Sequence, residues 1–319
     1  MSIELAGTIV PLVTPFGPDE RLDVPALEHL VDFALEHDAD GLMTTALTGE
    51  GLLLDGDETL VVWDAVFARA AGRVPIVPAV ITTTTRRAIE LVKAAEARGA
   101  AAAMVAPILP ELYSGRSPDD AYGFFADISA ATSLPLMLFN YPSLTNIDLT
   151  PAFIARLAGI ARIKYVKEST ADTARVHEIQ RLAGDRVTVI CGAPQVALES
   201  LALGCRIWIT GILNVVPASG KHLMQAVAGN DLDRARQIYH RQILPVFGVI
   251  RQSSNPTGTI KHGVTLRGVD VGVPRRPGRP LDEMYRGELQ RIVREVEESE
   301  GVGGGAEVRR FGGSEVRRF

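Results

Sequence analysis

Lys167 is the residue whose surroundings point most directly to chemistry, because it interrupts a short segment of strand-forming residues. Residues 163–170 read Ile-Lys-Tyr-Val-Lys-Glu-Ser-Thr, which predicts a strand with a polar exit. Side chains alternate along a strand, so Tyr165, Lys167 and Ser169 share one face. If that face lines a closed barrel, burial lowers the pKa of Lys167, and its neutral amine can form a Schiff base with a keto acid. The alternative is a lysine that reaches solvent from a strand end.

The elements that would position Lys167 recur with a regular spacing. Strand-like apolar segments alternate with segments of helical periodicity, at the length of one βα unit, about 30 residues. The strand-like segments cover residues 8–15, 41–48, 74–81, 102–108, 134–141, 163–167, 187–192 and 207–212. Eight such units in succession predict an α/β fold, a (β/α)8 TIM barrel, rather than an open sheet.

The last third of the chain changes character. Helical periodicity continues over residues 217–228, 232–251, 256–266 and 281–298 with no further strand. We therefore expect three regions. Residues 1–216 hold the barrel strands and the first seven helices, and residues 217–300 hold the last barrel helix and a C-terminal helical extension. Residues 301–319 form a glycine- and arginine-rich tail, which carries EVRRF twice and is expected to be flexible.

Composition excludes several classes of function. The 319 residues are 46% hydrophobic and 22% charged, and the net charge of −5 argues against nucleic acid or a membrane as partner. Cys191 and Cys205 lack metal-ligand spacing and suit a reducing compartment. No export signal, long apolar stretch, zinc-binding histidine pair or phosphate-binding loop is recognisable. We expect a cytoplasmic protein that needs no metal and no cofactor.

In a (β/α)8 barrel, active-site residues lie at the C-terminal ends of the strands. The second strand runs into residues 46–51, where the Thr48 hydroxyl and the backbone around Gly49 could cradle a carboxylate. The fifth strand ends in Phe139-Asn140-Tyr141-Pro142, the sixth carries Lys167, and the eighth leads to Ile212.

These motifs resemble the dihydrodipicolinate synthase and N-acetylneuraminate lyase family. Thr-Gly-Glu after the second strand, Asn-x-Pro after the fifth, Lys-Glu-Ser-Thr on the sixth and a late Asn-Pro…Lys stand in the family's order, and the resemblance covers residues 7–296. It implies a class I aldolase or lyase in which Lys167 forms the Schiff base. Thr48 and nearby N–H groups would bind the carboxylate of a 2-keto acid such as pyruvate. It also implies a homotetramer, a dimer of dimers.

Several positions depart from the family pattern. Leu47 stands where the first threonine of the proton relay is usual, and Phe139 stands where the relay tyrosine is usual. Leu144 replaces the arginine that binds the carboxylate of the aldehyde substrate in the synthases. Ile108 and Leu109 replace a tyrosine pair. Each change removes a polar donor or a cation.

Two consequences follow from these departures. A second substrate carboxylate would meet apolar side chains, at a cost of several kcal/mol, so an uncharged, apolar or aromatic aldehyde is the expected partner. Another hydroxyl must also shuttle protons. Tyr141, two residues beyond Phe139, is our candidate catalytic residue, and Tyr165 could set the environment of Lys167. The sequence leaves open which tyrosine replaces the relay, and a core aromatic is the alternative for both.

Two other functions stay open. One is 4-hydroxy-tetrahydrodipicolinate synthase or a dehydratase of sugar-derived keto acids. The other is a catalytically impaired homologue that binds a keto acid without turnover, which the loss of both relay hydroxyls favours. The presence of Lys167 argues against the second alternative.

Overall fold

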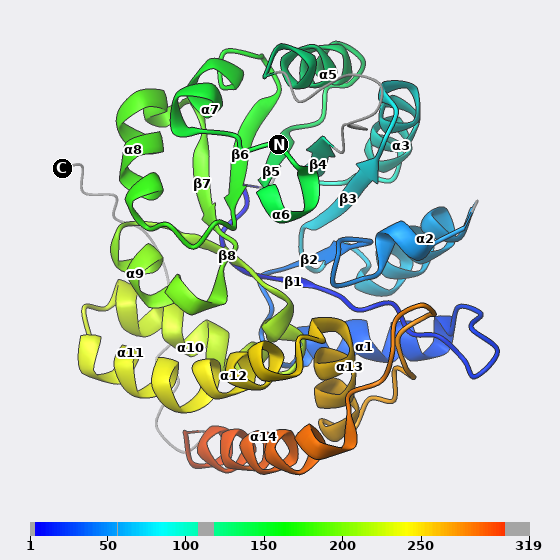
Figure 1. Cartoon of the computed structure of the whole chain (residues 1–319), viewed down its shortest axis with the longest axis vertical. Helices are drawn as coiled ribbons and strands as arrows, with labels where there is room; N and C mark the ends of the chain where they lie inside the picture. Colours follow the sequence, from blue (N-terminus) through cyan, green and yellow to red (C-terminus); the bar gives the residue numbers. More distant parts are fainter. Residues whose placement is uncertain (1–3, 56, 108–117, 304–319) are drawn as a thin grey trace.

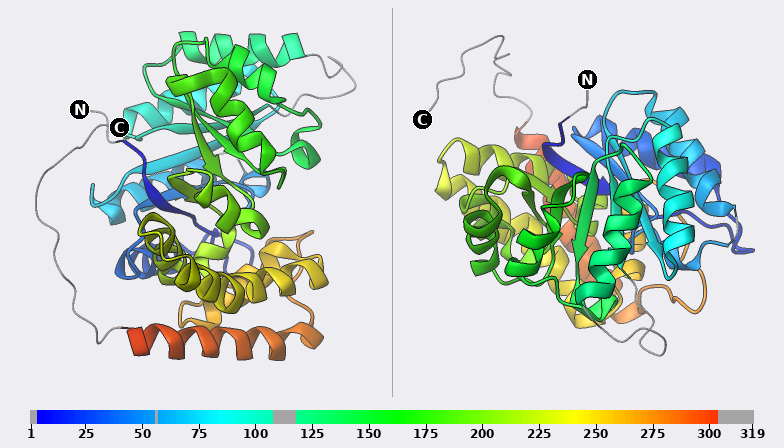
Figure 2. Two further views of the ribbon diagram at one scale, coloured as in Figure 1. Left: turned by 90° about the vertical axis from the view of Figure 1, so that its left-hand side faces the viewer. Right: turned by 90° about the horizontal axis from the view of Figure 1, so that it is seen from above.

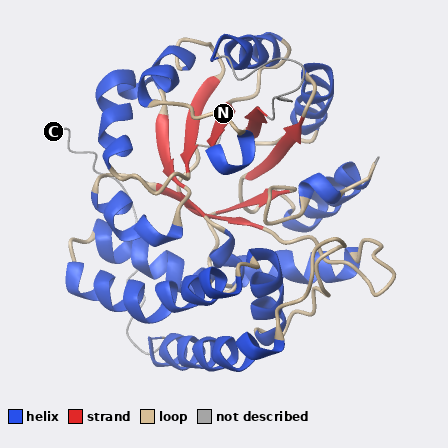
Figure 3. Ribbon diagram, viewed as in Figure 1, coloured by secondary structure: helices blue, strands red, loops and turns tan. Residues whose placement is uncertain are grey.

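The computed structural model describes residues 4–55, 57–107 and 118–303, and it confirms the barrel. Eight parallel strands close on themselves in sequence order, as Figures 1 and 3 show. The strands are β1 Gly7–Pro11, β2 Gly41–Thr44, β3 Ile76–Thr82, β4 Ala103–Pro107, β5 Leu136–Asn140, β6 Ile163–Glu168, β7 Thr188–Cys191 and β8 Ile207–Ile209. Each strand overlaps a predicted segment; several are shorter, and β1, β3 and β6 each extend one residue beyond it.

The second strand shows why the prediction ran too long. β2 ends at Thr44, because Thr45 adopts a left-handed conformation with φ of 54° that no strand can contain. The hydroxyl of Thr45 accepts a hydrogen bond from the indole of Trp63 (2.9 Å) and donates one to the carbonyl of Ala79 (3.0 Å). Residues 46–51 therefore form a loop at the mouth of the barrel.

Helices surround the strands on all sides (Figures 1 and 3). They are α1 Val24–Glu36, α2 Glu58–Ala70, α3 Thr85–Ala97, α5 Pro118–Ala130, α6 Pro142–Thr145, α7 Pro151–Leu157, α8 Ala174–Ala183, α9 Ala197–Ala202 and α10 Pro217–Ala228. Local signals set several starts. The carboxylate of Asp23 accepts from the N–H of Ala26 at the start of α1, and Thr150 caps α7 through the N–H of Phe153.

Two apolar layers fill the structure. The inner layer lies inside the barrel and includes Ile9, Met104 and Phe139, with Tyr165 packed against it. The outer layer lies between the strands and the helices and includes Val166. Strand alternation thus places Tyr165 inside and Val166 outside, as the sequence predicted.

The C-terminal extension packs along one side of the barrel. It consists of α11 Leu232–Ile238, a π-helical segment η5 Tyr239–Ile243, α12 Leu244–Ser253, α13 Pro256–Leu266 and α14 Glu283–Gly303. The single helix predicted over residues 232–251 is therefore wrong in detail. Figures 1 and 2 show α12 and α13 between the barrel and α14. In the part of the chain that the structure describes, no helix combines the length and apolar character needed to cross a membrane.

Candidate active site

Lys167 lies inside the barrel near the C-terminal end of β6, where its side chain is 7% exposed. Burial lowers its pKa from 10.5 to about 8, and a smaller effect of Cys191 opposes this shift. Phe139 is its register partner on β5, and the ammonium nitrogen lies 4.6 Å from the centre of that ring. Lys167 is thus an amine that can lose its proton near neutral pH.

A cavity of about 320 Å³ opens beside Lys167 at the C-terminal ends of the strands. Its lining contains most of the residues that the sequence singled out, namely Leu47, Thr48, Phe139, Tyr141, Lys167 and Ile212. Among the described residues that line this cavity, Lys167 is the only charged one. The cavity is therefore a largely apolar chamber around one amine.

Four residues that the sequence singled out are not among the described residues that line this cavity. Gly49 is not among the described lining residues. Its backbone packs closely against the chain, because a Cβ at this position would lie 2.8 Å from the carbonyl oxygen of Leu12. The carbonyl of Gly49 accepts a hydrogen bond from the hydroxyl of Thr14 (2.6 Å). Leu144 belongs to the short helix α6, next to Tyr141. Ile108 and Leu109 lie outside the described residues, as does the repeat-bearing tail beyond residue 303.

The two candidate tyrosines occupy different depths. Tyr141 caps α6 at the mouth and stacks on Phe139, with ring centres 5.8 Å apart. Tyr165 lies deeper, near the N-terminal end of β6, with a backbone hydrogen bond to Leu5, and burial raises its pKa. Tyr165 packs against the inner apolar layer and is not among the described residues that line the cavity. The geometry therefore favours Tyr141 as the residue near a bound substrate.

Gly192 is a site residue that the sequence analysis missed. A Cβ there would lie 2.1 Å from the hydroxyl oxygen of Ser169 and 3.0 Å from Cγ of Lys167. Only glycine lets β7 approach β6 so closely beside the reactive lysine. A glycine after a strand is the only signal in the sequence for this role, and many glycines share it.

Ser169 was also placed on the face of Lys167 without a role. Its hydroxyl is buried, lines the cavity and has no hydrogen-bond partner among the described residues. A buried hydroxyl without a partner costs free energy, so this one is available to a bound molecule.

The extension supplies a wall of the cavity. Phe247 and Ile250 of α12 and Pro256 and Ile260 of α13 all line it. The hydroxyl of Tyr239 in η5 donates to the carbonyl of Pro194, another lining residue (3.1 Å). The extension therefore shapes the site, which its helical pattern alone could not reveal.

Acidic residues near the mouth organise loops. One carboxylate oxygen of Glu168 accepts from the N–H of Thr170 (2.8 Å), and the other accepts from Asn140 (2.9 Å) and Arg175 (3.1 Å). These bonds hold the ends of β5 and β6 together. They also fix the start of the loop after β6, through the backbone N–H of Thr170.

The described part of the chain shows no separate metal centre. Within residues 4–55, 57–107 and 118–303, no group of His, Cys, Asp and Glu side chains could hold a metal ion. Cys191 and Cys205 are free and buried, and burial raises the pKa of these thiols to about 11 and about 12.

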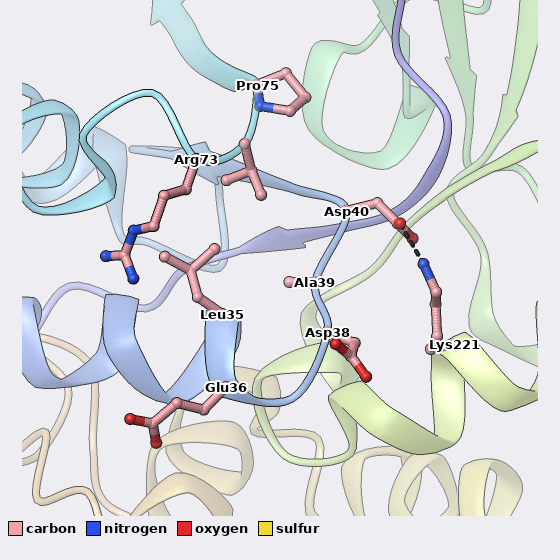
Figure 4. A pocket seen from close by; sticks show the side chains of 9 residues that line it. Leu35, Glu36, Asp38, Ala39, Asp40, Arg73, Pro75 and Lys221 are labelled. Carbon is pink, nitrogen blue, oxygen red and sulfur yellow. Dashed lines mark hydrogen bonds and ion pairs between the residues drawn. The ribbon is translucent and has the colours of Figure 1, made fainter. Parts of the chain in front are cut away.

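A second pocket lies at the opposite end of the barrel, and Figure 4 shows its lining. It has a volume of about 510 Å³, and an ion pair between Asp40 and Lys221 lies at one edge of its lining. Asp40 also accepts hydrogen bonds from the backbone N–H (2.9 Å) and the hydroxyl (3.2 Å) of Thr8. These contacts tie α10 to the starts of β1 and β2, which is a structural role.

A buried lysine of lowered pKa at the mouth of a closed parallel barrel is typical of Schiff-base barrel enzymes. Residues 4–296 match the Dihydrodipicolinate synthetase family, and the chain belongs to that family. It is accordingly a class I lyase of the lysine Schiff-base type.

Individual relatives and solved structures support this family assignment. The chain is 31% identical to the 4-hydroxy-tetrahydrodipicolinate synthase of Trichlorobacter lovleyi over 91% of this chain and 98% of that protein. It is 33% identical to the enzyme of the same name from Nitrosococcus oceani, over 91% and 97%. A dihydrodipicolinate synthase from Acinetobacter baumannii complexed with pyruvate superposes with a TM-score of 0.85 at 28% identity, over 92% of this chain and 99% of that chain. A prophage protein of the family from E. coli K12, also in complex with pyruvate, gives 0.84 at 27%, over 92% and 98%.

Proposed function

We propose that this protein is a carbon–carbon lyase, or aldolase, that acts on a pyruvate-type 2-keto acid together with an uncharged, apolar aldehyde. The observation that carries the proposal is the buried amine of Lys167, which has a pKa of about 8. The other described residues that line its cavity are uncharged. Two similar structures contain pyruvate, which supports the choice of keto acid. The enzyme would work in the cytoplasm as a homo-oligomer, a dimer of dimers.

The residues suggest a sequence of steps. The neutral amine of Lys167 adds to the keto carbon, the resulting hydroxyl group takes up a proton from solvent and leaves as water, and a protonated imine forms. Thr48 and the N–H groups of its loop hold the keto-acid carboxylate. The neighbouring carbon loses a proton to water, its electron pair moves toward the imine nitrogen, and an enamine results. The enamine carbon attacks the aldehyde carbon, the aldehyde oxygen takes up a proton, and hydrolysis frees Lys167. Cleavage follows the reverse order.

The lining supports an apolar aldehyde. Five residues that line the cavity with Lys167 have no polar group on their side chains, namely Leu47, Phe139, Ile212, Phe247 and Ile250. A second carboxylate buried there would lack a cation other than Lys167 among the described lining residues. Tyr141 remains the candidate hydrogen-bond donor to the aldehyde oxygen.

A second candidate is 4-hydroxy-tetrahydrodipicolinate synthase, because relatives of that name reach 33% identity over nearly their whole length. That reaction brings an aldehyde with its own carboxylate into the site. The leucine at position 144 argues against it, as does a described lining with no cation other than Lys167.

The test is chemical trapping. The protein is incubated with pyruvate and borohydride, which reduces an imine to a stable amine, and the intact mass is measured. One adduct in the wild type and none in Lys167→Ala would support the Schiff base. No adduct with pyruvate or larger 2-keto acids would refute it. A panel of apolar aldehydes and aspartate semialdehyde then decides between the two candidates: faster turnover of aspartate semialdehyde would overturn the apolar partner.

A further inference from the structure

A second buried lysine lies close to the site without lining it. Lys261 of α13 is 1% exposed, and its ammonium nitrogen lies 2.6 Å from one carboxylate oxygen of Glu50. The same nitrogen donates to the carbonyl of Val273 (3.0 Å) and lies 4.4 Å from the centre of the Phe16 ring. Burial of such a pair costs desolvation free energy, and apolar residues of similar volume often give the same stability.

Glu50 stands at the end of the loop that carries Thr48. Its backbone is left-handed, with φ of 54°, and its N–H donates to the carbonyl of Leu47 (3.0 Å), which closes the turn. Its second carboxylate oxygen accepts from the N–H of Arg275 (2.8 Å). Both oxygens of Glu50 are therefore engaged by the C-terminal extension, one by α13 and one by the segment that follows it.

Arg275 makes this attachment firm. Its guanidinium forms a two-point ion pair with Glu58 of α2, at 2.6 and 2.7 Å, and donates to the carbonyl of Glu20. It also lies 4.2 Å from the centre of the Phe16 ring. The extension is thus tied to the loops after β1 and β2, so Glu50 is held by a fixed frame.

The helix that holds Glu50 also borders the cavity. Ile260, next to Lys261 in α13, lines it. A Cβ at Gly211 would lie 2.7 Å from the terminal carbon of Ile260 and 2.9 Å from the hydroxyl oxygen of Thr48, so these side chains converge. One turn of α13 therefore lies close to Thr48 across Gly211, and its Lys261 holds the end of the same loop through Glu50.

We propose that the Glu50–Lys261 ion pair is a positioning device, which aligns the hydroxyl and N–H groups of the Thr48 loop for the carboxylate of the keto acid. This inference rests on the proposed function, because it takes that loop as the carboxylate site. Neither residue of the pair is among the described lining residues, so the pair acts through the loop. Loss of the pair should weaken keto-acid binding and leave the chemistry of Lys167 intact.

The decisive variant is Glu50→Gln/Lys261→Met, which removes both charges together and leaves no unpaired buried ion. We expect the pyruvate concentration for half-maximal trapping to rise at least tenfold. The maximal trapping rate should stay within about twofold of the wild-type rate. The pH midpoint of trapping should stay within about 0.5 pH units of the wild-type value, which is on the order of experimental scatter. The melting temperature should also remain close to that of the wild type.

A second variant covers the case in which the double variant does not fold. Glu50→Asp keeps the charge and the left-handed backbone, which aspartate tolerates well, but it shortens the arm by one methylene. It should also raise the half-maximal pyruvate concentration, by about threefold or more. The matched control is Arg267→Met/Glu300→Gln, which removes another ion pair of the extension (2.8 Å) between the end of α13 and α14. It should lower the melting temperature without changing the pyruvate dependence.

The outcomes separate this inference from the proposed function. If the wild type forms no adduct, the proposed Schiff-base function itself fails. If the wild type traps pyruvate but Glu50→Gln/Lys261→Met and Glu50→Asp require the same pyruvate concentration, the positioning role is overturned. The positioning role would also be overturned if the control variant raised the half-maximal pyruvate concentration as much as the double variant does. General loosening of the extension would then explain both results.

Discussion

The burial of Lys167 makes a quantitative prediction about pH. With a pKa of about 8, the amine is neutral in about one molecule in eleven at pH 7, against about one in three thousand for an ordinary lysine at 10.5. The reactive form is therefore enriched by roughly 300-fold. Initial rates of imine formation should rise about tenfold per pH unit below pH 8, and they should level off above pH 8.

The assay is a pH series of trapping at saturating pyruvate. Cyanoborohydride replaces borohydride because it tolerates acid, and the mass adduct is counted at early times between pH 6 and pH 10. The control is Lys164, an exposed lysine of the same strand: Lys164→Ala should leave the profile unchanged. A rate that is independent of pH, or one that still climbs tenfold between pH 9 and pH 10, would refute the argument that burial activates Lys167.

Three further predictions follow from the same site. In the folded state the pKa of Lys167 lies below its unfolded value, so the buried ammonium destabilises the fold by up to about 3 kcal/mol below pH 8, and this cost disappears as pH rises towards 10.5. Lys167→Met should therefore be more stable than wild type in urea at pH 7, and the difference should shrink by pH 10. Gly192→Ala should reduce trapping at least tenfold, because its Cβ would collide with Ser169 beside the lysine, whereas Gly123→Ala on an open helix surface should have no effect. Tyr141→Phe should slow turnover of an apolar aldehyde by about tenfold or more while pyruvate trapping persists; unchanged turnover would remove Tyr141 from the mechanism.

The sequence was sufficient to predict how the strands present Lys167. Strand alternation put Tyr165 and Lys167 on the inner face and Val166 on the outer one, and the structure confirms this arrangement. Eight regularly spaced units predicted the closed barrel in the right order. Both predictions succeed because they depend on local periodicity, which a parallel barrel translates directly into position.

The walls of the cavity were less predictable for a physical reason. Helical periodicity shows that Phe247 and Ile250 share a face with the apolar residues of α12, but it does not show which surface that face covers. The π-helical segment η5 before α12 further changes the phase of the helix. Gly192 and Ser169 depend on the separation between two strands, which is a property of the assembled barrel.

The pKa of Lys167 and the proposed choice of aldehyde are two results of the same burial. The chamber that destabilises an ammonium also destabilises any charge that a substrate brings into it. A second carboxylate would be costly in itself, and its proximity would favour the ammonium form of Lys167 and so reduce the fraction of reactive amine. The keto-acid carboxylate would escape this conflict only if the Thr48 loop binds it with N–H groups, away from the apolar wall of Phe247 and Ile250. Activation of the lysine and exclusion of a charged aldehyde therefore require the same apolar lining.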